Sequence, residues 1–218
     1  MKYSEQLTQL LTQGEVPLNN SLDYTGIGFS AEHADELIRM ATDAELLNAD
    51  ADSPEFLAVI HAWYALAQLK VAAAVEPLLD LIDASKYDLL FDQEYPKVFA
   101  LTGEVAIPEL KNYLYDENRE DLVRAHALHS LNAFGKTYRQ ACLDILCELL
   151  QKLDQSSKEL AGMVISSLMD LKATEAIETI RDAFNRDCVN ISIPGDLEDV
   201  EIDLGLRNKR DTPRPNYN

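Results

Sequence analysis

The chain has 218 residues, 47% of them hydrophobic and only eight each Gly and Pro, a composition that excludes disordered and collagen-like chains. Its formal charge of −19 argues against nucleic acid or anionic lipid as a partner and favours a basic or mixed protein surface, although acidic residues that only keep a protein in solution would give the same value. Neither a signal-peptide core nor an apolar run near the roughly 20 residues of a membrane helix is present. We therefore predict a soluble cytoplasmic protein.

Residues 1–52 are predicted to form an N-terminal helical cap. Residues 3–12 have the spacing of a short amphipathic helix, and residues 14–29 are predicted to form a loop. Ser30 suits the N-cap of a helix that runs to about Ala41. Thr42 together with Glu45 matches a capping box for one further turn.

Residues 53–189 contain an internal repeat. Shifting residues 61–82 by 32 places Leu66 on Val98, and shifting by 102 places it on Leu168, in both cases without a gap. A third copy lies between these two at a shift of 62, with its second half displaced by about five more residues. Four repeats of roughly 30–40 residues therefore follow one another, a period typical of stacked helix pairs.

Each repeat is predicted to contain two helices. In the first repeat, Ser53 is a suitable N-cap and Pro54 a suitable first helical residue. Apolar residues then recur at helical spacing through both helices. Gly103 and Gly135 are predicted to end the first helices of the second and third repeats by adopting positive φ.

Residues 190–218 are predicted to leave the helical pattern. Acidic and apolar residues alternate from Glu198 to Leu204, which indicates a short extended segment on the last repeat. A basic, proline-containing tail from Arg207 to the end is predicted to be flexible. We treat this tail, the cap and the repeats as one continuous domain.

The repeats resemble the HEAT-like class, including the type found in phycobilin lyases, with Leu and Ala at packing positions and Ala-Val/Ile-x-x-Leu at the start of each second helix. The resemblance implies an all-α right-handed α-α superhelix, or α-solenoid. A narrower resemblance is to an uncharacterised bacterial HEAT-repeat family. It is carried by His61-Ala62-Trp63, Ala176-Ile177, Gly195-Asp196 and Leu204-Gly205-Leu206. Some members of that family carry a cysteine-rich zinc tail, but this chain ends at Asn218 without those cysteines, so no zinc is inferred from the resemblance.

No catalytic, metal or cofactor site is predicted. His126 and His129 share a helix face, yet a zinc ion needs further ligands that are not close in sequence. Gly26 to Ala31 matches a dinucleotide fingerprint but does not follow a buried strand. Trp63 is predicted to belong to the core. Cys142, Cys147 and Cys188 are an odd number without a CxxC pair, which indicates reduced thiols.

One set of polar residues recurs at equivalent positions of the repeats. The shift of 102 places Glu76 on Glu178 and Asp80 on Asp182. All four are predicted to lie on second helices, which line the concave surface of HEAT-like stacks. The middle repeats place Asn112 and Tyr115 at equivalent positions. We take these six residues as a candidate partner-binding face, with an ordinary solvated acidic face as the alternative.

The sequence thus favours a non-enzymatic interaction or scaffold module whose acidic repeat surface binds another protein. A phycobilin-lyase-like enzyme, or another HEAT-repeat enzyme that handles a small molecule, is the alternative, and it would require a pocket with a positioned acid or nucleophile. A DNA glycosylase would need a basic groove, which the net charge opposes.

Overall fold

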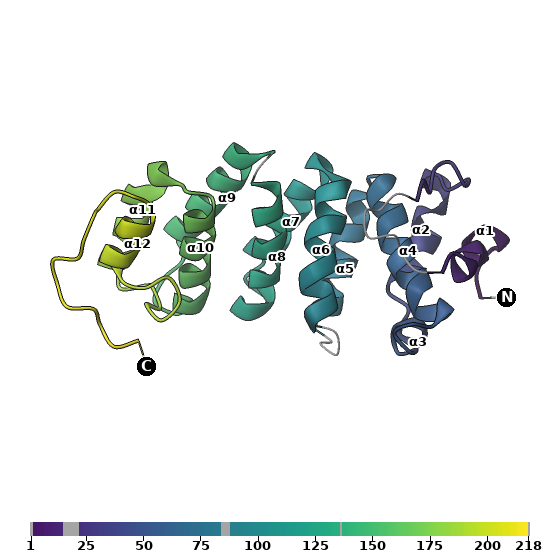
Figure 1. Cartoon of the computed structure of the whole chain (residues 1–218), viewed down its shortest axis with the longest axis horizontal. Coiled ribbons are helices and arrows are strands. Elements are labelled where there is room, and N and C mark those ends of the chain that lie inside the picture. The colour runs from purple at the N-terminus through teal and green to yellow at the C-terminus, as the bar shows by residue number, and fades with distance from the viewer. Residues whose placement is uncertain (1, 15–21, 84–87, 136, 218) are drawn as a thin grey trace. The chain divides into compact units, whose positions relative to one another are not determined.

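The computed structural model describes residues 2–14, 22–83, 88–135 and 137–217. All regular secondary structure in these residues is helical (Figure 1). The chain divides into two compact units, Met1–Leu110 and Lys111–Asn218, and the division lies within one helix. The predicted all-α class is therefore confirmed for the described residues.

The first unit contains the N-terminal helices and the first repeats. Its elements are α1 (Glu5–Thr8), 3-10 turns at Gln9–Thr12 and Ala31–His33, α2 (Ala34–Ala41), α3 (Ala44–Leu47), α4 (Pro54–Gln68), a 3-10 turn at Ala72–Ala74, α5 (Val75–Asp83), α6 (Asp88–Thr102), a 3-10 turn at Glu104–Ala106 and the start of α7 (Ile107–Tyr115). The described part of the predicted loop over 14–29 contains no helix or strand, and residues 15–21 lie outside the described residues.

The helix starts of the first unit follow from their capping residues. Ser53 Oγ accepts a hydrogen bond from the N–H of Phe56, with Pro54 in the first turn of α4, as predicted. Asp43, and not Thr42, caps α3: its carboxylate accepts from the N–H of Glu45. Thr42 instead donates to the carbonyl of Ile38 at the end of α2, so the predicted capping box is wrong.

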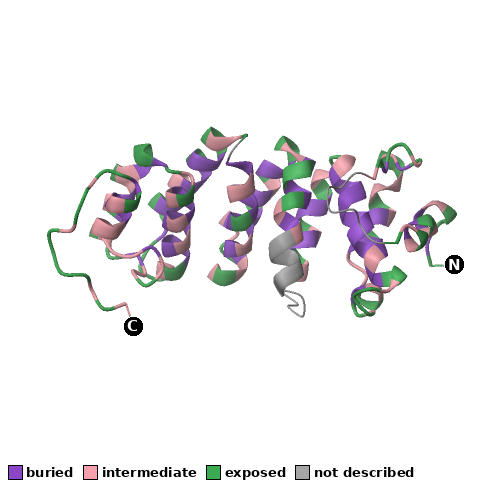
Figure 2. Ribbon diagram, viewed as in Figure 1, coloured by how far each residue is buried: buried purple, intermediate pink, exposed green. Residues whose placement is uncertain are grey.

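Helix α4 lies at the centre of the core of the first unit. It contacts α2, α3 and α6, and 11 of its 15 residues are buried (Figure 2). Trp63 is fully buried, donates its indole N–H to the carbonyl of Ala41 at 2.9 Å and meets the ring of Tyr95 edge-on at 5.0 Å. The prediction that Trp63 belongs to the core is confirmed.

The second unit continues with longer helices. Its elements are the end of α7, α8 (Asp121–Phe134), α9 (Arg139–Lys152), α10 (Lys158–Asp170), a 3-10 turn at Thr174–Ala176, α11 (Ile177–Asn185) and α12 (Leu197–Asp203). Within this unit α8 packs against α10, and α9 packs against α11. First helices therefore contact first helices and second helices contact second helices, which buries the apolar stripe of each helix.

The repeat register found in the sequence matches the helix boundaries. Val75, Ile107 and Ile177 each begin a nine-residue helix directly after a three-residue 3-10 turn. The alanine that ends each of these turns is buried. The third repeat differs, since its second helix, α9, runs for 14 residues. This greater length agrees with the sequence repeat, in which the second half of the third copy is displaced by about five residues.

The two glycines predicted to end helices behave differently. Gly103 has φ 80° and follows the last residue of α6, as predicted. Gly135 follows α8 with φ −56°, so the predicted positive φ is wrong there. A side chain at Gly135 would place its Cβ 2.1 Å from Cδ2 of Leu171. Gly135 therefore leaves room for the close approach of Leu171 and does not supply a left-handed backbone.

Residues 197–203 form α12 and not the predicted extended segment. Asp196 caps this helix by accepting from the N–H of Asp199, and two acidic residues occupy its first turn. Gly205 ends it with φ 74°, and the N–H of Leu206 donates to the carbonyl of Glu201 at 2.8 Å. These caps at both ends stabilise a helix of two turns, which the alternating pattern alone does not distinguish from a strand.

Candidate functional site

The two acidic pairs of the candidate face lie where the repeat register places them. Glu76 and Asp80 are exposed one turn apart on α5 in the first unit, and Glu178 and Asp182 are exposed one turn apart on α11 in the second. The Glu178 carboxylate accepts from Nη1 of Arg181 at 2.7 Å. The carboxylate of Asp182 accepts from Nε of Arg186 at 2.8 Å. The carboxylates of α11 are therefore accessible but already paired with a cation.

The two middle positions of the candidate face have different environments. Asn112 is exposed on α7, whereas the half-buried Tyr115 donates its phenol O–H to the carbonyl of Ile145 at 2.7 Å. The ammonium groups of Lys111 and Lys152 each lie 5.0 Å from the centre of the Tyr115 ring, a cation–π geometry. Tyr115 thus joins α7 to α9 and is partly exposed.

Glu148 lies between the two lysines that flank Tyr115. Its carboxylate accepts from Lys111 and from Lys152, each at 2.8 Å. These two hydrogen bonds lower the pKa of Glu148 to about 2. The result is a polar cluster of two cations and one anion on the α7–α9 surface, which the sequence analysis did not identify.

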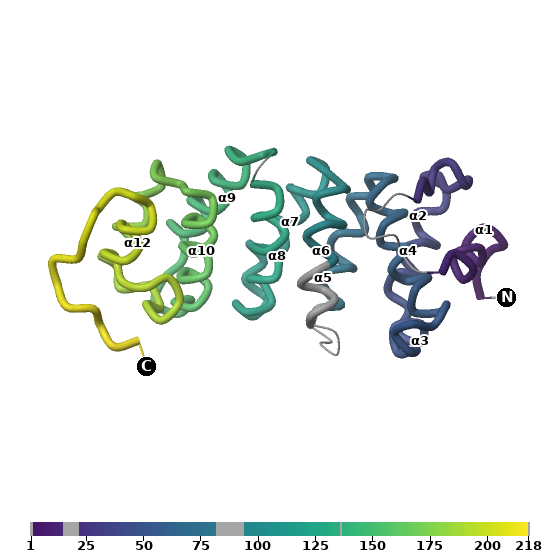
Figure 3. The backbone as a smooth tube through the Cα atoms, viewed as in Figure 1, coloured from purple at the N-terminus to yellow at the C-terminus, as the bar shows by residue number. Residues whose placement is uncertain are grey.

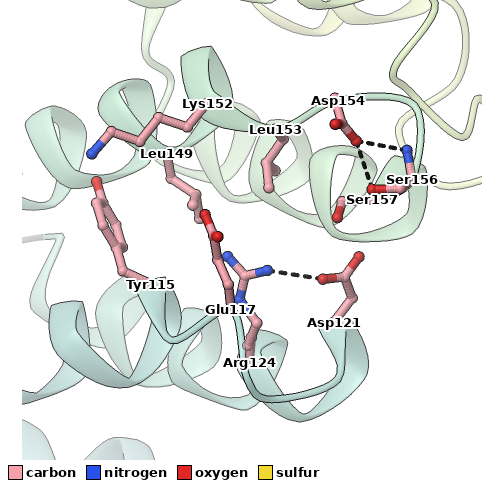
Figure 4. A pocket seen from close by; sticks show the side chains of 10 residues that line it. All are labelled: Tyr115, Glu117, Asp121, Arg124, Leu149, Lys152, Leu153, Asp154, Ser156 and Ser157. Carbon is pink, nitrogen blue, oxygen red and sulfur yellow. Dashed lines mark hydrogen bonds and ion pairs between the residues drawn. The ribbon is translucent and has the colours of Figure 1, made fainter.

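A cavity of about 360 Å³ lies next to this cluster, entirely within the second unit (Figure 4). Its lining comes from the ends of α7 and α9 and from the starts of α8 and α10. The lining residues are Tyr115, Glu117, Asp121, Arg124, Leu149, Lys152, Leu153, Asp154, Ser156 and Ser157. Apolar side chains on one wall and charges of both signs on the others suit a small amphipathic or zwitterionic molecule more than a simple anion.

Arg124 is the most deeply buried charge in that cavity. Its side chain is 4% exposed. Its Nε donates to the carbonyl of Leu114 at 2.8 Å, and Nη1 donates to Asp121 at 2.9 Å. The guanidinium thus closes the C-terminal end of α7, and among the described residues Nη2 has no hydrogen-bond partner. A single Arg within an apolar helix face is the sequence signal that could have indicated this position.

The structure also joins the acidic and basic parts of the C-terminal region. Arg207 and Arg210 of the tail form ion pairs with Glu198, Glu201 and Asp196 on and before α12. The acidic α12 segment and the basic tail, which the sequence analysis treated as separate features, therefore bind each other.

His61 is a further buried polar residue. It is fully buried and holds Tyr24 Oη at 2.7 Å from Nδ1 and the carbonyl of Gly14 at 3.0 Å from Nε2. Burial lowers the pKa of its imidazole. His61 therefore fastens the N-terminal region to α4, a structural role.

The remaining sequence candidates are not assembled into a reactive group. His129 is exposed and His126 half-buried, and no three His, Cys, Asp or Glu side chains within the described ranges are placed to share a metal ion. Gly26 and Gly28 belong to a turn that leads into a 3-10 turn and not to a strand–helix junction. In the part of the chain that the structure describes, every helix is too short or too polar to cross a bilayer.

The chain belongs to the DUF1186 family, described as proteins of unknown function, whose model matches residues 30–212. The match runs from just before α2 through α12 to the first half of the tail. No curated protein and no solved structure matches the chain.

Proposed function

We propose that this protein is a non-enzymatic interaction module with a HEAT-like α-solenoid fold, in which an acidic repeat surface binds a basic or mixed surface of another protein. The observation that carries this proposal is the recurrence of exposed carboxylate pairs one turn apart, Glu76 with Asp80 and Glu178 with Asp182, at equivalent positions of two repeats. Exposed carboxylate pairs, one on each of two equivalent helices, suit a cationic partner surface.

The hydrogen bonds made by the buried polar groups support the same proposal. His61 and Arg124 are occupied by backbone carbonyls and by neighbouring side chains, so both stabilise the fold. Because these two residues serve the fold, we base the proposed function on the exposed surface charge. Stacking of first helices on first helices and of second helices on second helices supports the solenoid part of the proposal.

Charge reversal tests the proposed face. The variants are Glu76→Lys/Asp80→Lys and Glu178→Lys/Asp182→Lys, used as bait to capture proteins from a lysate of the source organism at low and moderate salt. We expect at least one protein captured reproducibly by the wild type to be lost, roughly tenfold or more, from either variant. The matched control is Asp144→Lys/Glu159→Lys, which changes the net charge equally at exposed positions of α9 and α10. Equal capture by the control and the α11 variant would refute the proposal that Glu178 and Asp182 bind the partner.

A small-molecule function is the second candidate, and the cavity around Arg124 is the observation that favours it. Absence of a salt-sensitive partner, together with a rise in melting temperature on adding small amphipathic molecules, would support this alternative. Substitution of Ser157 by Ala at the cavity wall should then reduce that rise.

A further inference from the structure

The tail after α12 is bound to the protein without forming regular secondary structure. Residues 206–217 contain no helix or strand and run around α12 (Figure 3). Their few apolar side chains contribute little to this attachment, because Leu206 is 46% exposed and Pro213 is exposed. The attachment therefore depends on polar contacts.

Three arginines and one tyrosine make these contacts. Arg210 donates to Asp196 at 2.8 Å and to Asp199 at 2.7 Å through Nη1. Arg214 donates to Asp199 at 2.8 Å, and the Tyr217 hydroxyl donates to the same carboxylate. One carboxylate, Asp199, thus receives three side chains from the tail.

Arg207 and the tail backbone bind the neighbouring carboxylates. Arg207 donates to Glu201 at 2.8 Å and to Glu198 at 3.0 Å. Glu198 also accepts from the backbone N–H groups of Asp211 and Thr212, each at 3.2 Å. The site therefore recognises guanidinium groups and, in addition, the backbone of an extended chain.

Burial differs between the two sides of this contact. The side chains of Glu198, Asp199 and Glu201 are 15%, 13% and 7% exposed, and exposure of the arginines rises along the set from 16% at Arg210 and 29% at Arg207 to 66% at Arg214. Burial alone raises the pKa of Asp199, but hydrogen bonds from Tyr217, Arg214 and Arg210 lower it to about 2. Largely shielded carboxylates whose cationic partners come mainly from one irregular, arginine-rich segment have the properties of a receptor with a bound ligand.

We propose that Asp196, Glu198 and Asp199 form a receptor for an extended, arginine-containing segment of a partner protein, and that the chain's own tail occupies this receptor until the partner displaces it. The inference rests on the proposed function, because it assumes a basic protein partner, and it adds a specific surface and a means of regulation. A tail tethered directly to the end of α12 competes at an effective concentration on the order of millimolar, so the receptor is closed to weak ligands.

The test uses the full chain and a fluorescently labelled peptide with the sequence of residues 205–217. In the variant Arg210→Gln/Arg214→Gln, called the open variant, the tail loses its charged contacts with Asp196 and Asp199 and keeps only the Tyr217 hydroxyl there, which weakens its hold on the receptor. We expect the peptide to bind this open variant at least tenfold more tightly than the wild type, measured by fluorescence anisotropy at low salt. Lys209→Gln is the matched control, because Lys209 is exposed and has no ion pair among the described residues, and it should behave as the wild type.

Two further variants locate the binding site. Asp199→Asn, added to the open variant, should abolish peptide binding, and Glu198→Gln should weaken it several-fold, with the circular dichroism spectrum unchanged in both. Equal peptide binding by the wild type and the open variant would overturn the displacement mechanism. Binding that survives both carboxylate changes would overturn the receptor. The peptide assay does not involve the carboxylate pairs on α5 and α11. The proposed partner-binding face and the proposed receptor are therefore tested by independent experiments.

Discussion

At the scale of single residues, the ends of several helices require a left-handed backbone. Lys70, Lys172 and Asp187 have φ of 56°, 50° and 54°, each directly after a helix C-cap residue. At Lys70 the N–H of the next residue, Val71, donates back to the carbonyl of Leu66, which closes a Schellman motif. Glycine adopts this conformation without steric penalty, whereas a residue with a side chain is strained by roughly 1–2 kcal/mol.

Lys70→Gly is therefore expected to stabilise the protein. The relief of strain should exceed the entropy that glycine adds to the unfolded chain, for a net gain of about 0.5–1 kcal/mol. The free energy of unfolding in denaturant measures this gain. Lys70 is exposed and has no ion pair among the described residues, so the substitution removes no ion pair there. A lower stability of the variant would contradict the assignment of strain.

A second expectation at this scale concerns pH and His61. The carbonyl of Gly14 can only accept, so Nε2 carries the proton, and Nδ1 accepts from the hydroxyl of Tyr24. Burial favours this neutral imidazole and lowers its pKa from 6.5. The unfolded chain therefore binds the proton more readily than the folded one, and stability is lost as pH falls below about 6.5 towards the lower folded pKa.

His61→Gln tests this linkage. The variant keeps a donor and an acceptor but does not titrate, so its stability should fall less than that of the wild type between pH 7.5 and 5.5. Thermal unfolding across this range is the measurement, and the comparison is the difference in slope between the two proteins. Identical slopes would show that His61 does not contribute to the pH dependence.

At the scale of helices, packing depends on one buried apolar row in each repeat. Leu66, Val98 and Leu168 are equivalent under the repeat shifts, and each is at most 1% exposed. Burial of a Leu contributes roughly 1.5–3 kcal/mol, and a buried unpaired carboxylate would add a larger penalty. Leu168→Asp should therefore prevent folding.

Leu122→Asp is the matched control for this change, because Leu122 is on α8 and is 59% exposed. We expect Leu168→Asp to be recovered as insoluble protein and Leu122→Asp to be soluble with a helical circular dichroism spectrum. Soluble, helical Leu168→Asp would refute the packing described for the second unit.

The sequence predicts helix pairs well and short elements poorly, for physical reasons. Helical periodicity over 15 residues, together with Ser53 and Pro54, indicates α4 and its start correctly. The seven residues of α12 are too few for periodicity to decide between helix and strand, so the caps at Asp196 and Gly205 determine the outcome.

Contacts between residues distant in sequence were also not predicted. The close approach of Leu171 to Gly135, the cavity around Arg124 and the pairing of the tail with α12 all depend on tertiary structure. The carboxylate pairs on α5 and α11 could be placed because the repeat shift transfers a known position from one repeat to another.

At the scale of the whole molecule, the formal charge of −19 is what remains after all 19 Lys and Arg are counted against the 38 Asp and Glu. The basic tail is itself bound to carboxylates, so arginines that could have balanced the acidic surface elsewhere are used at α12. An excess of this size attracts a cationic partner over several ångströms and makes its association dependent on ionic strength.

The central claim is that acidic surface charge selects the partner, and the salt dependence of affinity tests it most directly. The dissociation constant of the captured partner would be measured by calorimetry from about 0.02 M to 0.5 M monovalent salt, across the range in which the Debye length falls to less than about 8 Å. The account predicts an affinity that falls steadily by tenfold or more over this range. An affinity that does not change with salt would contradict it and would place binding on an uncharged surface.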